Sequence, residues 1–365
     1  MPAARTGGDR MVRVTVAMSG GVDSAAAAAL LQEQGFAVSG ATMRLYCPGG
    51  REPDDLKDAA QTAARLGIPH YLFEFEDTFR AEVLLPFRDG YVRGETPNPC
   101  VLCNRRLKFG RFLARALLLG ADRIATGHYA RVTYDGDSGR YRLWKAADLG
   151  KDQSYVLYSL SQWELSHVMF PLGGLHKEEA RALVAARGLG LPVAHKKDSQ
   201  DICFVPDGDY AGFLEREMGV VSPPGKFIDT AGRVLGEHRG LVRYTVGQRR
   251  GLGQGFGRPL YVLRKDLQHN AVVLGEEREL YQSRLTAGAV NWVSGQPPDG
   301  PIAVSAKTRY SQKEAAATVR ALPDGRAQVY FESPQRAVTA GQAVVFYDGD
   351  EVLGGGTILR EEPVR

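Results

Sequence analysis

A short glycine-containing turn, set between an apolar run and an alanine-rich segment, constrains the fold of this chain more than any other feature. The apolar run Val12 to Met18 is typical of a buried parallel strand, and the turn is Ser19-Gly20-Gly21-Val22-Asp23-Ser24. The segment Ala25 to Gln34 consists largely of strong helix formers and ends before Gly35, which suits a left-handed helix cap. A strand, a tight turn and a helix in direct succession predict the first unit of an α/β domain.

The alternation of strand and helix continues along the first half of the chain. Extended segments are expected at Phe36 to Tyr46, Pro69 to Phe75 and Arg123 to Thr126, with helices at Asp54 to Leu66 and Arg105 to Leu119. This alternation predicts a doubly wound, mostly parallel sheet. In such a sheet, ligands bind at the carboxyl ends of the strands, which is where the glycine-containing turn lies.

The second half of the chain has a different pattern. After about Phe204, glycine and proline become frequent, and from about Leu285 the pattern is almost purely β. Asp324-Gly325 and Asp348-Gly349-Asp350 separate alternating runs, which is a strong signal for hairpins. We therefore expect four parts: a disordered tail at 1–10, the α/β domain at 11–204, a small, mainly β central domain at 205–282 and a C-terminal β-barrel at 283–365.

Composition excludes several classes of protein. The chain has 365 residues and a net charge of +4, a mild excess that permits a polyanionic partner without requiring one. Its four cysteines are too few for a disulfide scaffold of this length. No apolar run is long enough to cross a bilayer, and Met1 to Arg10 lacks the apolar core of a secretory signal. We expect a monomeric cytoplasmic protein with no membrane contact.

The turn at 19–24 has the chemistry of a phosphate-binding loop. Backbone N–H groups at the start of a helix lack partners and attract anions, and two adjacent glycines let phosphate oxygens approach the backbone. Ser19 and Ser24 add hydroxyl donors, whereas Asp23 would repel phosphate unless a cation such as Mg²⁺ lay between them. The turn lacks the Gly-Lys-Ser/Thr ending of the common nucleoside-triphosphate loop. It resembles the loop of the PP-loop ATP pyrophosphatase superfamily, whose members split ATP between the α and β phosphates and adenylate a carbonyl oxygen.

Two cysteines far apart in the sequence have the character of a reactive pair. Cys103 precedes a helix, and a thiol near a helix N-terminus has a lowered pKa; Arg105 and Lys108 are among the basic residues beside it. Cys203 lies at the edge of the predicted α/β domain. If the fold brings these thiols together, one can carry sulfane sulfur as a persulfide and the other can release it by forming a disulfide.

Over nearly its whole length the chain resembles the tRNA-specific 2-thiouridylase family. The resemblance is carried by 17–24, Thr96 to Phe109, Thr126-Gly127-His128-Tyr129, Lys151 to Tyr155, Asp198 to Val205, Tyr244 to Arg249 and Arg309-Tyr310. It implies an enzyme that uses ATP and Mg²⁺ to adenylate the wobble uridine, position 34, of the tRNAs for Lys, Glu and Gln, and that then transfers persulfide sulfur to C2. The implied partners are the anticodon arm of tRNA and a persulfide relay fed by a cysteine desulfurase.

The resemblance also implies roles for single residues. Cys103 would be the catalytic nucleophile and Cys203 the persulfide carrier, and the two would close a transient disulfide after transfer. ATP would be bound by Ala17, Met18, Ser19, Gly20, Gly21, Val22, Asp23, Ser24, Met43 and Gly127, with Asp23 as a contact of Mg²⁺. The target base would be bordered by Asn98, Pro99 and Cys100. The tRNA would be contacted by His128, Lys151, Asp152, Gln153, Arg309, Tyr310 and Gln342.

Alternatives to this assignment stay open at this point. Some relatives have an aspartate at the position of Cys100, so its thiol is assigned only to the lining of the base site, and Cys47 is assigned no role. Another PP-loop enzyme, an adenylating ligase or amidotransferase for a small molecule, would need neither Cys103 nor Cys203. An iron–sulfur protein, including an iron–sulfur-dependent tRNA thiolase, or a zinc site at Cys100 and Cys103, would use the cysteines as ligands.

Overall fold

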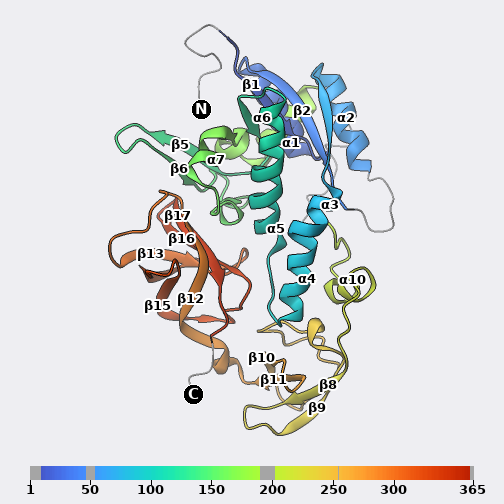
Figure 1. The fold of residues 1–365 in the computed structure, drawn as a ribbon, viewed down its shortest axis with the longest axis vertical. Coiled ribbons are helices and arrows are strands. Elements are labelled where there is room, and N and C mark those ends of the chain that lie inside the picture. Colours follow the sequence, from blue (N-terminus) through green and yellow to red (C-terminus); the bar gives the residue numbers. More distant parts are fainter. Residues whose placement is uncertain (1–9, 47–53, 190–201, 254, 362–365) are drawn as a thin grey trace.

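The computed structural model describes residues 10–46, 54–189, 202–253 and 255–361. Figure 1 shows three parts: an α/β part that contains the N-terminus, a small β part at the opposite end of the long axis, and a β-barrel beside the helices between them. Of the expected tail at 1–10, only Arg10 is described, and it donates a hydrogen bond to Asp122 at 2.7 Å. Cys47 lies outside the described residues.

A five-stranded sheet forms the centre of the α/β part. Its strands are β1 (Arg13–Ala17), β2 (Ala37–Arg44), β3 (His70–Glu74), β4 (Arg123–Ala125) and β7 (Val168–Met169). They lie in the order β3-β2-β1-β4-β7, and every neighbouring pair is parallel. The predicted parallel sheet is therefore confirmed. Because β1 and β4 are neighbours, the loops that follow them meet at one edge of the sheet.

Helices cover both faces of this sheet, as expected for a doubly wound fold. On one face lie α1 (Val22–Glu33), α2 (Asp54–Leu66) and α8 (Lys177–Ala186). The buried alanines of α1 let this helix pack closely on the strands and on α8. The other face is covered by η3 (Cys103–Phe112) and α6 (Leu113–Leu118). The shorter helices are η4 (Ser154–Val156), α7 (Gln162–His167), η5 (Pro171–Gly174), η6 (Leu241–Arg243) and η7 (Glu277–Leu280).

Two stretches of π-helix interrupt the α-helices. η3 has the i+5 to i hydrogen bonds of a π-helix, where the sequence predicts an ordinary helix from Arg105 to Leu119. It continues directly from α5 (Pro99–Leu102). A second π-helical stretch packs against it, η2 (Arg80–Leu84), between α3 (Glu76–Phe79) and α4 (Leu85–Val92). π-helical turns are rare and are often found at functional sites.

The central part contains a four-stranded sheet in the order β10-β11-β8-β9. The strands are β8 (Gly225–Ile228), β9 (Val234–His238), β10 (Tyr261–Asp266) and β11 (Ala271–Gly275). The helix α10 (Tyr210–Arg216) belongs to a different hydrophobic cluster. In that cluster the Phe204 ring lies 5.3 Å from Phe213 of α10 and 5.7 Å from Phe79 of α3, measured between ring centroids. These contacts hold the segment that follows Cys203 against the helices of the α/β part.

A closed six-stranded barrel forms the C-terminal part, as predicted. Its strands are β12 (Tyr281–Trp292), β13 (Ile302–Lys307), β14 (Ala315–Ala321), β15 (Ala327–Arg336), β16 (Ala343–Asp348) and β17 (Glu351–Ile358). Closure follows from the pairing of β12 with both β15 and β17. Both predicted hairpins are confirmed: β14 and β15 flank Gly325, and β16 and β17 flank Gly349.

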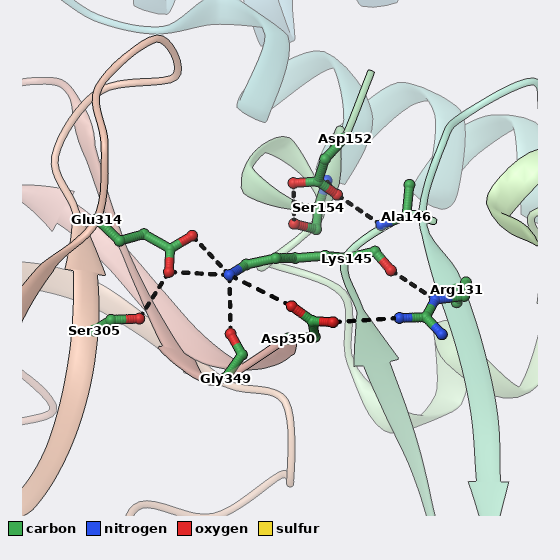
Figure 2. A network of polar contacts seen from close by, with 9 residues as sticks. All are labelled: Arg131, Lys145, Ala146, Asp152, Ser154, Ser305, Glu314, Gly349 and Asp350. Carbon is green, nitrogen blue, oxygen red and sulfur yellow. Dashed lines mark hydrogen bonds and ion pairs between the residues drawn. The ribbon is translucent and has the colours of Figure 1, made fainter. Parts of the chain in front are cut away.

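A hairpin of the α/β part extends the barrel sheet. β5 (Arg131–Asp135) and β6 (Arg140–Trp144) form the hairpin, and β6 pairs antiparallel with β17. Figure 2 shows Lys145, directly after β6, reaching into the barrel, where its Nζ lies 2.8 Å from Glu314 Oε1 and 2.9 Å from Gly349 O. Strand pairing and a half-buried ion pair therefore join the two parts.

Candidate active site

The glycine-containing loop lies at the carboxyl end of β1 and leads into α1, as predicted. Gly20 has a φ of +71°, and a Cβ there would lie 2.4 Å from the backbone oxygen of Asp55. Ser24 Oγ accepts a hydrogen bond from Ser19 N at 3.2 Å and donates one to Gly21 O at 3.0 Å, which closes the loop on itself. No side chain of the described residues caps α1, so its first N–H groups suit an anion.

The apolar residues of the predicted ATP site pack against the interior of the protein next to this loop. Met18 and Val22 are buried, and Met18 O accepts a hydrogen bond from Thr42 Oγ1 at 2.8 Å. Ala17 and Met43, near the ends of β1 and β2, pack against the hydrophobic core of the sheet. The loop and Met43 therefore lie at the same edge of the sheet, with the exposed Ser19 at its surface.

Asp23 is paired with a lysine that the sequence analysis missed. Lys177, the first residue of α8, donates hydrogen bonds from Nζ to both carboxylate oxygens at 2.9 Å, and its side chain is 4% exposed. Tyr129 OH donates a further bond to Asp23 Oδ1 at 2.9 Å. Lys177 lies on an ordinary amphipathic helix, so no local pattern marks it. Its charge offsets the repulsion that Asp23 would exert on a phosphate.

The segment that follows β4 connects the loop to the cysteines. A Cβ on Gly127 would lie 2.7 Å from the backbone carbon of Asp23, so this glycine packs directly on the loop. The next residue, His128, is 8% exposed, and its Nε2 lies 3.4 Å from Lys108 Nζ. Burial, and then the charge of Lys108, hold the pKa of His128 well below its ordinary value, so the ring is neutral. Its side chain lies in the interior and not at a surface open to tRNA.

The fold brings together the cysteines that the sequence places far apart. Asn98 Oδ1 accepts a hydrogen bond from Cys100 N at 3.1 Å and thereby caps α5, which leads to Cys103. Cys100 and Cys203 are exposed, and Cys103 is half-buried. Cys203 lies near enough to Cys103 and Cys100 for these thiols to raise the pKa of its own. Cys103 and Phe204 belong to one hydrophobic cluster.

The expected lowering of the pKa of the Cys103 thiol is wrong for this conformation. Desolvation raises the pKa of Cys103, and Lys108 opposes it only in part. The pKa of Cys203 is raised to about 12, first by desolvation and then by Cys103 and Cys100. Cys203 lies at an exposed turn, but desolvation by the surrounding protein still has the largest effect on the pKa of its thiol. Both thiols are therefore protonated at neutral pH in this state.

Two residues expected to contact tRNA, Asp152 and Gln153, form hydrogen bonds with other residues of the chain. Asp152 Oδ1 accepts hydrogen bonds from Ala146 N and Ser154 N, and its Oδ2 accepts one from Ser154 Oγ (Figure 2). Gln153 Oε1 accepts a hydrogen bond from Tyr129 N at 3.0 Å, which places it one residue from His128. Lys151, half-buried, lies in the turn before them. This segment therefore connects the hairpin to the surroundings of the phosphate loop.

The residues of the barrel that are expected to contact tRNA also form hydrogen bonds within the chain. Gln342 Nε2 donates a hydrogen bond to Thr96 O at 2.6 Å, just before the capping residue of α5. Arg309 Nη2 donates to Val246 O at 3.1 Å, Ala337 O at 2.9 Å and Thr339 Oγ1 at 2.7 Å. Tyr310 is exposed, and its OH donates to Asp152 O at 3.0 Å.

Within the described ranges, no three His, Cys, Asp or Glu side chains are grouped so that they could hold a metal ion. This finding gives no support to an iron–sulfur or zinc assignment for Cys100, Cys103 and Cys203. Within those same ranges, Asp23 is likewise not part of any such group of three. None of the helices described here is long and apolar enough to cross a membrane.

Three family models match consecutive parts of the chain. They are the tRNA methyl transferase HUP domain over residues 12–207, the tRNA methyl transferase PRC-barrel domain over 211–276 and the aminomethyltransferase beta-barrel domain over 282–358. The match of the first model covers more than half of the chain, including the phosphate loop and the cysteines.

Full-length relatives are also similar to this chain. The tRNA-specific 2-thiouridylase MnmA of Acetivibrio thermocellus is 49% identical over 356 residues, which cover 95% of this chain and 99% of that protein. The protein of the same name from Magnetococcus marinus is 50% identical over 356 residues, with the same coverage of both chains. Among solved structures, the NMN synthetase of Francisella tularensis aligns with 57% of this chain and 78% of its own, at a TM-score of 0.32 and 17% identity. That structural similarity is too low to support an argument about function.

Proposed function

This chain belongs to the tRNA-specific 2-thiouridylase family, and we propose that it uses ATP to activate the wobble uridine of tRNA and replaces the oxygen at C2 with sulfur. The observation that carries the proposal is the segment Thr126–His128. Gly127 packs on the phosphate loop, and His128 contacts Lys108, whose charge acts on Cys103 and Cys203. One short segment thus connects an ATP-binding loop with a pair of thiols, as sulfur transfer to an adenylated base requires.

The first step makes the carbonyl oxygen of the base a good leaving group. O2 of the uridine attacks the α-phosphorus of ATP, an O–P bond forms, and the bond from the α-phosphorus to the pyrophosphate oxygen breaks. The N–H groups of Ser19–Ser24 and the start of α1 stabilise the negative charge that builds up on pyrophosphate. The contact between Lys177 and Asp23 keeps the carboxylate from opposing that charge.

The second step transfers sulfur from a persulfide on Cys203. Its terminal sulfur attacks C2, a C–S bond forms, and AMP leaves with the electron pair of the C–O bond. The Cys103 thiolate then attacks Sγ of Cys203, and a disulfide forms as the bond from Sγ to the transferred sulfur breaks. The transferred sulfur keeps that electron pair as a thiocarbonyl. The two cysteines are oxidised in this step, so a thiol reductant must reopen the disulfide before the next turnover.

The remaining parts of the proposal concern the substrates. Asn98, Pro99 and Cys100 would border the target base, which must leave its stack to reach the pocket. The tRNAs would be those for Lys, Glu and Gln, held at the anticodon arm, and a persulfide relay fed by a cysteine desulfurase would supply sulfur. We expect the protein to act as a monomer in the cytoplasm, where these substrates are found.

Magnesium would accompany ATP rather than occupy a site of its own. Lys177 and Tyr129 already hold the Asp23 carboxylate, and the part of the chain that the structure describes groups no three metal ligands around it. Bound to the phosphates, the ion would neutralise charge on the pyrophosphate. The steps above depend on the loop, Lys177 and the two thiols.

The test compares wild type with Cys103→Ser and Cys203→Ser in a thiolation assay with tRNA, ATP and a persulfide donor. Both variants should lose formation of 2-thiouridine, whereas tRNA-dependent exchange of pyrophosphate into ATP should persist, because adenylation does not use the thiols. Cys47→Ser is the control. Equal thiolation by all four proteins would contradict the relay and favour a small-molecule ligase with the same loop. Iron that co-purifies under anaerobic conditions would favour the iron–sulfur alternative.

A further inference from the structure

The π-helical winding of η3 determines which residues lie on the same side of the helix as Cys103. In an α-helix, residues five apart point about 140° away from each other, because one turn takes 3.6 residues. In a π-helix each hydrogen bond joins residues five apart, so those residues lie on the same side of the helix. Cys103 begins η3 and Lys108 is five residues later. The unusual winding therefore places Lys108 on the same side of the helix as the cysteine.

A buried histidine fixes the position of this lysine. Lys108 Nζ lies 3.4 Å from His128 Nε2, and His128 Nδ1 lies 2.7 Å from Thr126 Oγ1. An ammonium group can only donate, so Nε2 accepts and Nδ1 carries the proton that is donated to Thr126. The His128 ring packs beside Phe109 and Phe170, at centroid distances of 5.8 Å and 6.1 Å. The ring therefore has one orientation and one tautomer, and it presents an acceptor to Lys108.

The charges around the two thiols make this lysine distinctive. Besides desolvation, the charges of Lys108 and Cys100 shift the pKa of Cys103. The pKa of Cys203 is shifted by the charges of Cys103, Cys100 and Lys108. On the barrel side, desolvation, then Asp152 and Cys100, raise the pKa of the Tyr310 phenol. The neutral His128 ring contacts Lys108 through Nε2. Among these described groups, Lys108 is the one cation, and its charge lowers the pKa of both Cys103 and Cys203.

We propose that Lys108 is the electrostatic partner of Cys103 and Cys203 during sulfur transfer, and that His128 is a positioning residue that acts through Lys108. The thiolate, and not the thiol, is the nucleophile in disulfide exchange. As each sulfur loses its proton to solvent, the fixed ammonium group stabilises the anion without giving up its own proton. This inference rests on the proposed function and assigns His128 a role other than direct contact with tRNA.

Alkylation of the free enzyme tests the lysine without tRNA or ATP. Iodoacetamide labelling, followed by peptide-resolved mass spectrometry over a range of pH, measures the titration midpoint of each cysteine. Lys108→Gln should move the midpoints of Cys103 and Cys203 upward and slow their labelling at pH 8 by about 3–10-fold. Lys108→Arg should restore most of the rate. The matched control is Arg106→Gln, which removes an exposed charge from the same helix and should label like wild type.

His128→Asn should shift both midpoints in the same direction as Lys108→Gln but by less, because Lys108 keeps its charge and loses its fixed position. Unfolding of the helix would give the opposite sign, since an opened helix exposes its thiols and labels faster. The single-turnover rate of Lys108→Gln should recover as pH rises, with KM for tRNA unchanged.

Unchanged midpoints in Lys108→Gln, or an equal shift in Arg106→Gln, would overturn the proposal. That failure is distinct from failure of the sulfur relay. The relay is tested by loss of thiolation in Cys103→Ser, whatever the labelling of Lys108→Gln shows.

Discussion

Lys177 donates hydrogen bonds to both carboxylate oxygens of Asp23, at 2.9 Å each, from a helix that begins 154 residues further along the chain. Common phosphate loops carry a lysine within the loop, whereas here the lysine beside the loop comes from α8 and pairs with Asp23. Because the Lys177 side chain is 4% exposed and that of Asp23 33% exposed, water screens the pair only in part.

Replacing this lysine should affect both ATP binding and stability. Lys177→Met leaves Asp23 uncompensated beside the phosphates, so we expect Kd for ATP to rise by about 10–100-fold and the free energy of unfolding to fall by about 2–3 kcal/mol. Calorimetry with ATP and chemical denaturation measure the two effects. Asp23→Asn combined with Lys177→Met should be less destabilised than the sum of the single changes. The control is Lys226→Met, which removes an exposed ion pair with Glu237. If the two single lysine variants are equally stable, the role assigned to the buried pair is wrong.

Gly127 should not tolerate a methyl group. In Gly127→Ala the new Cβ would lie 2.7 Å from the backbone carbon of Asp23 and 2.8 Å from Ser24 N, so the phosphate loop must shift. We expect ATP affinity to fall by about tenfold or more, because the loop donors lose their alignment. Gly136→Ala is the matched control, since a Cβ there meets no atom within 4 Å. ATP titration of both variants tests this, and equal affinities would contradict the contact.

Lys265 should make stability depend on pH in the alkaline range. This lysine is 6% exposed, and desolvation, followed by the charge of Arg360, lowers its pKa to about 8. Below pH 8 the folded and unfolded chains both hold the proton, so the full cost of the buried charge, roughly 3 kcal/mol, is present. Between pH 8 and about 10.4 only the unfolded chain stays protonated, so wild type gains stability as pH rises.

Lys265→Met removes this cost and should be more stable than wild type at pH 7. The advantage should shrink as pH rises toward 10. Urea denaturation at several pH values measures the difference between the two proteins. A constant difference across this range would show that Lys265 does not titrate as stated.

Arg309 should contribute to stability in the absence of RNA. Arg309→Met removes the donor to Val246 O, which joins the central part to the barrel, and the donors to Ala337 O and Thr339 Oγ1 within the barrel part. We expect a loss of about 2–4 kcal/mol in denaturation without tRNA, since the buried acceptors lose their partner. The control is Arg320→Met, an exposed residue of β14, which should change stability by less than about 0.5 kcal/mol. Wild-type stability in Arg309→Met would leave tRNA contact as its role.

The parallel sheet and the barrel hairpins could be predicted because they depend on local patterns. An apolar run, Gly20-Gly21 and an alanine-rich helix are sufficient to specify a strand–loop–helix unit. Gly325 and Gly349 have φ values of +80° and +56°, which alternating runs on both sides of Asp-Gly already indicate.

Features that depend on tertiary contacts could not be predicted in this way. The π-helical winding of η3 differs from an α-helix by one residue per hydrogen-bonded ring, and helix propensities do not distinguish the two. Lys177 can be recognised as the partner of Asp23 only once α8 lies against α1. The Cys103 thiol illustrates a third limit: its place near a helix start favours the anion, but its burial, which the sequence does not reveal, has the larger effect.

The pairing of β6 with β17 means that the barrel sheet continues into a hairpin that belongs to the α/β part of the sequence. A chain shortened before β12 would leave the outer edge of β6 without a neighbour, and such an open edge invites pairing with other molecules. A barrel transplanted alone would likewise lose the Lys145 ammonium that neutralises Glu314. Any chimera of this enzyme should therefore carry residues 131–145 together with the strands that they complete.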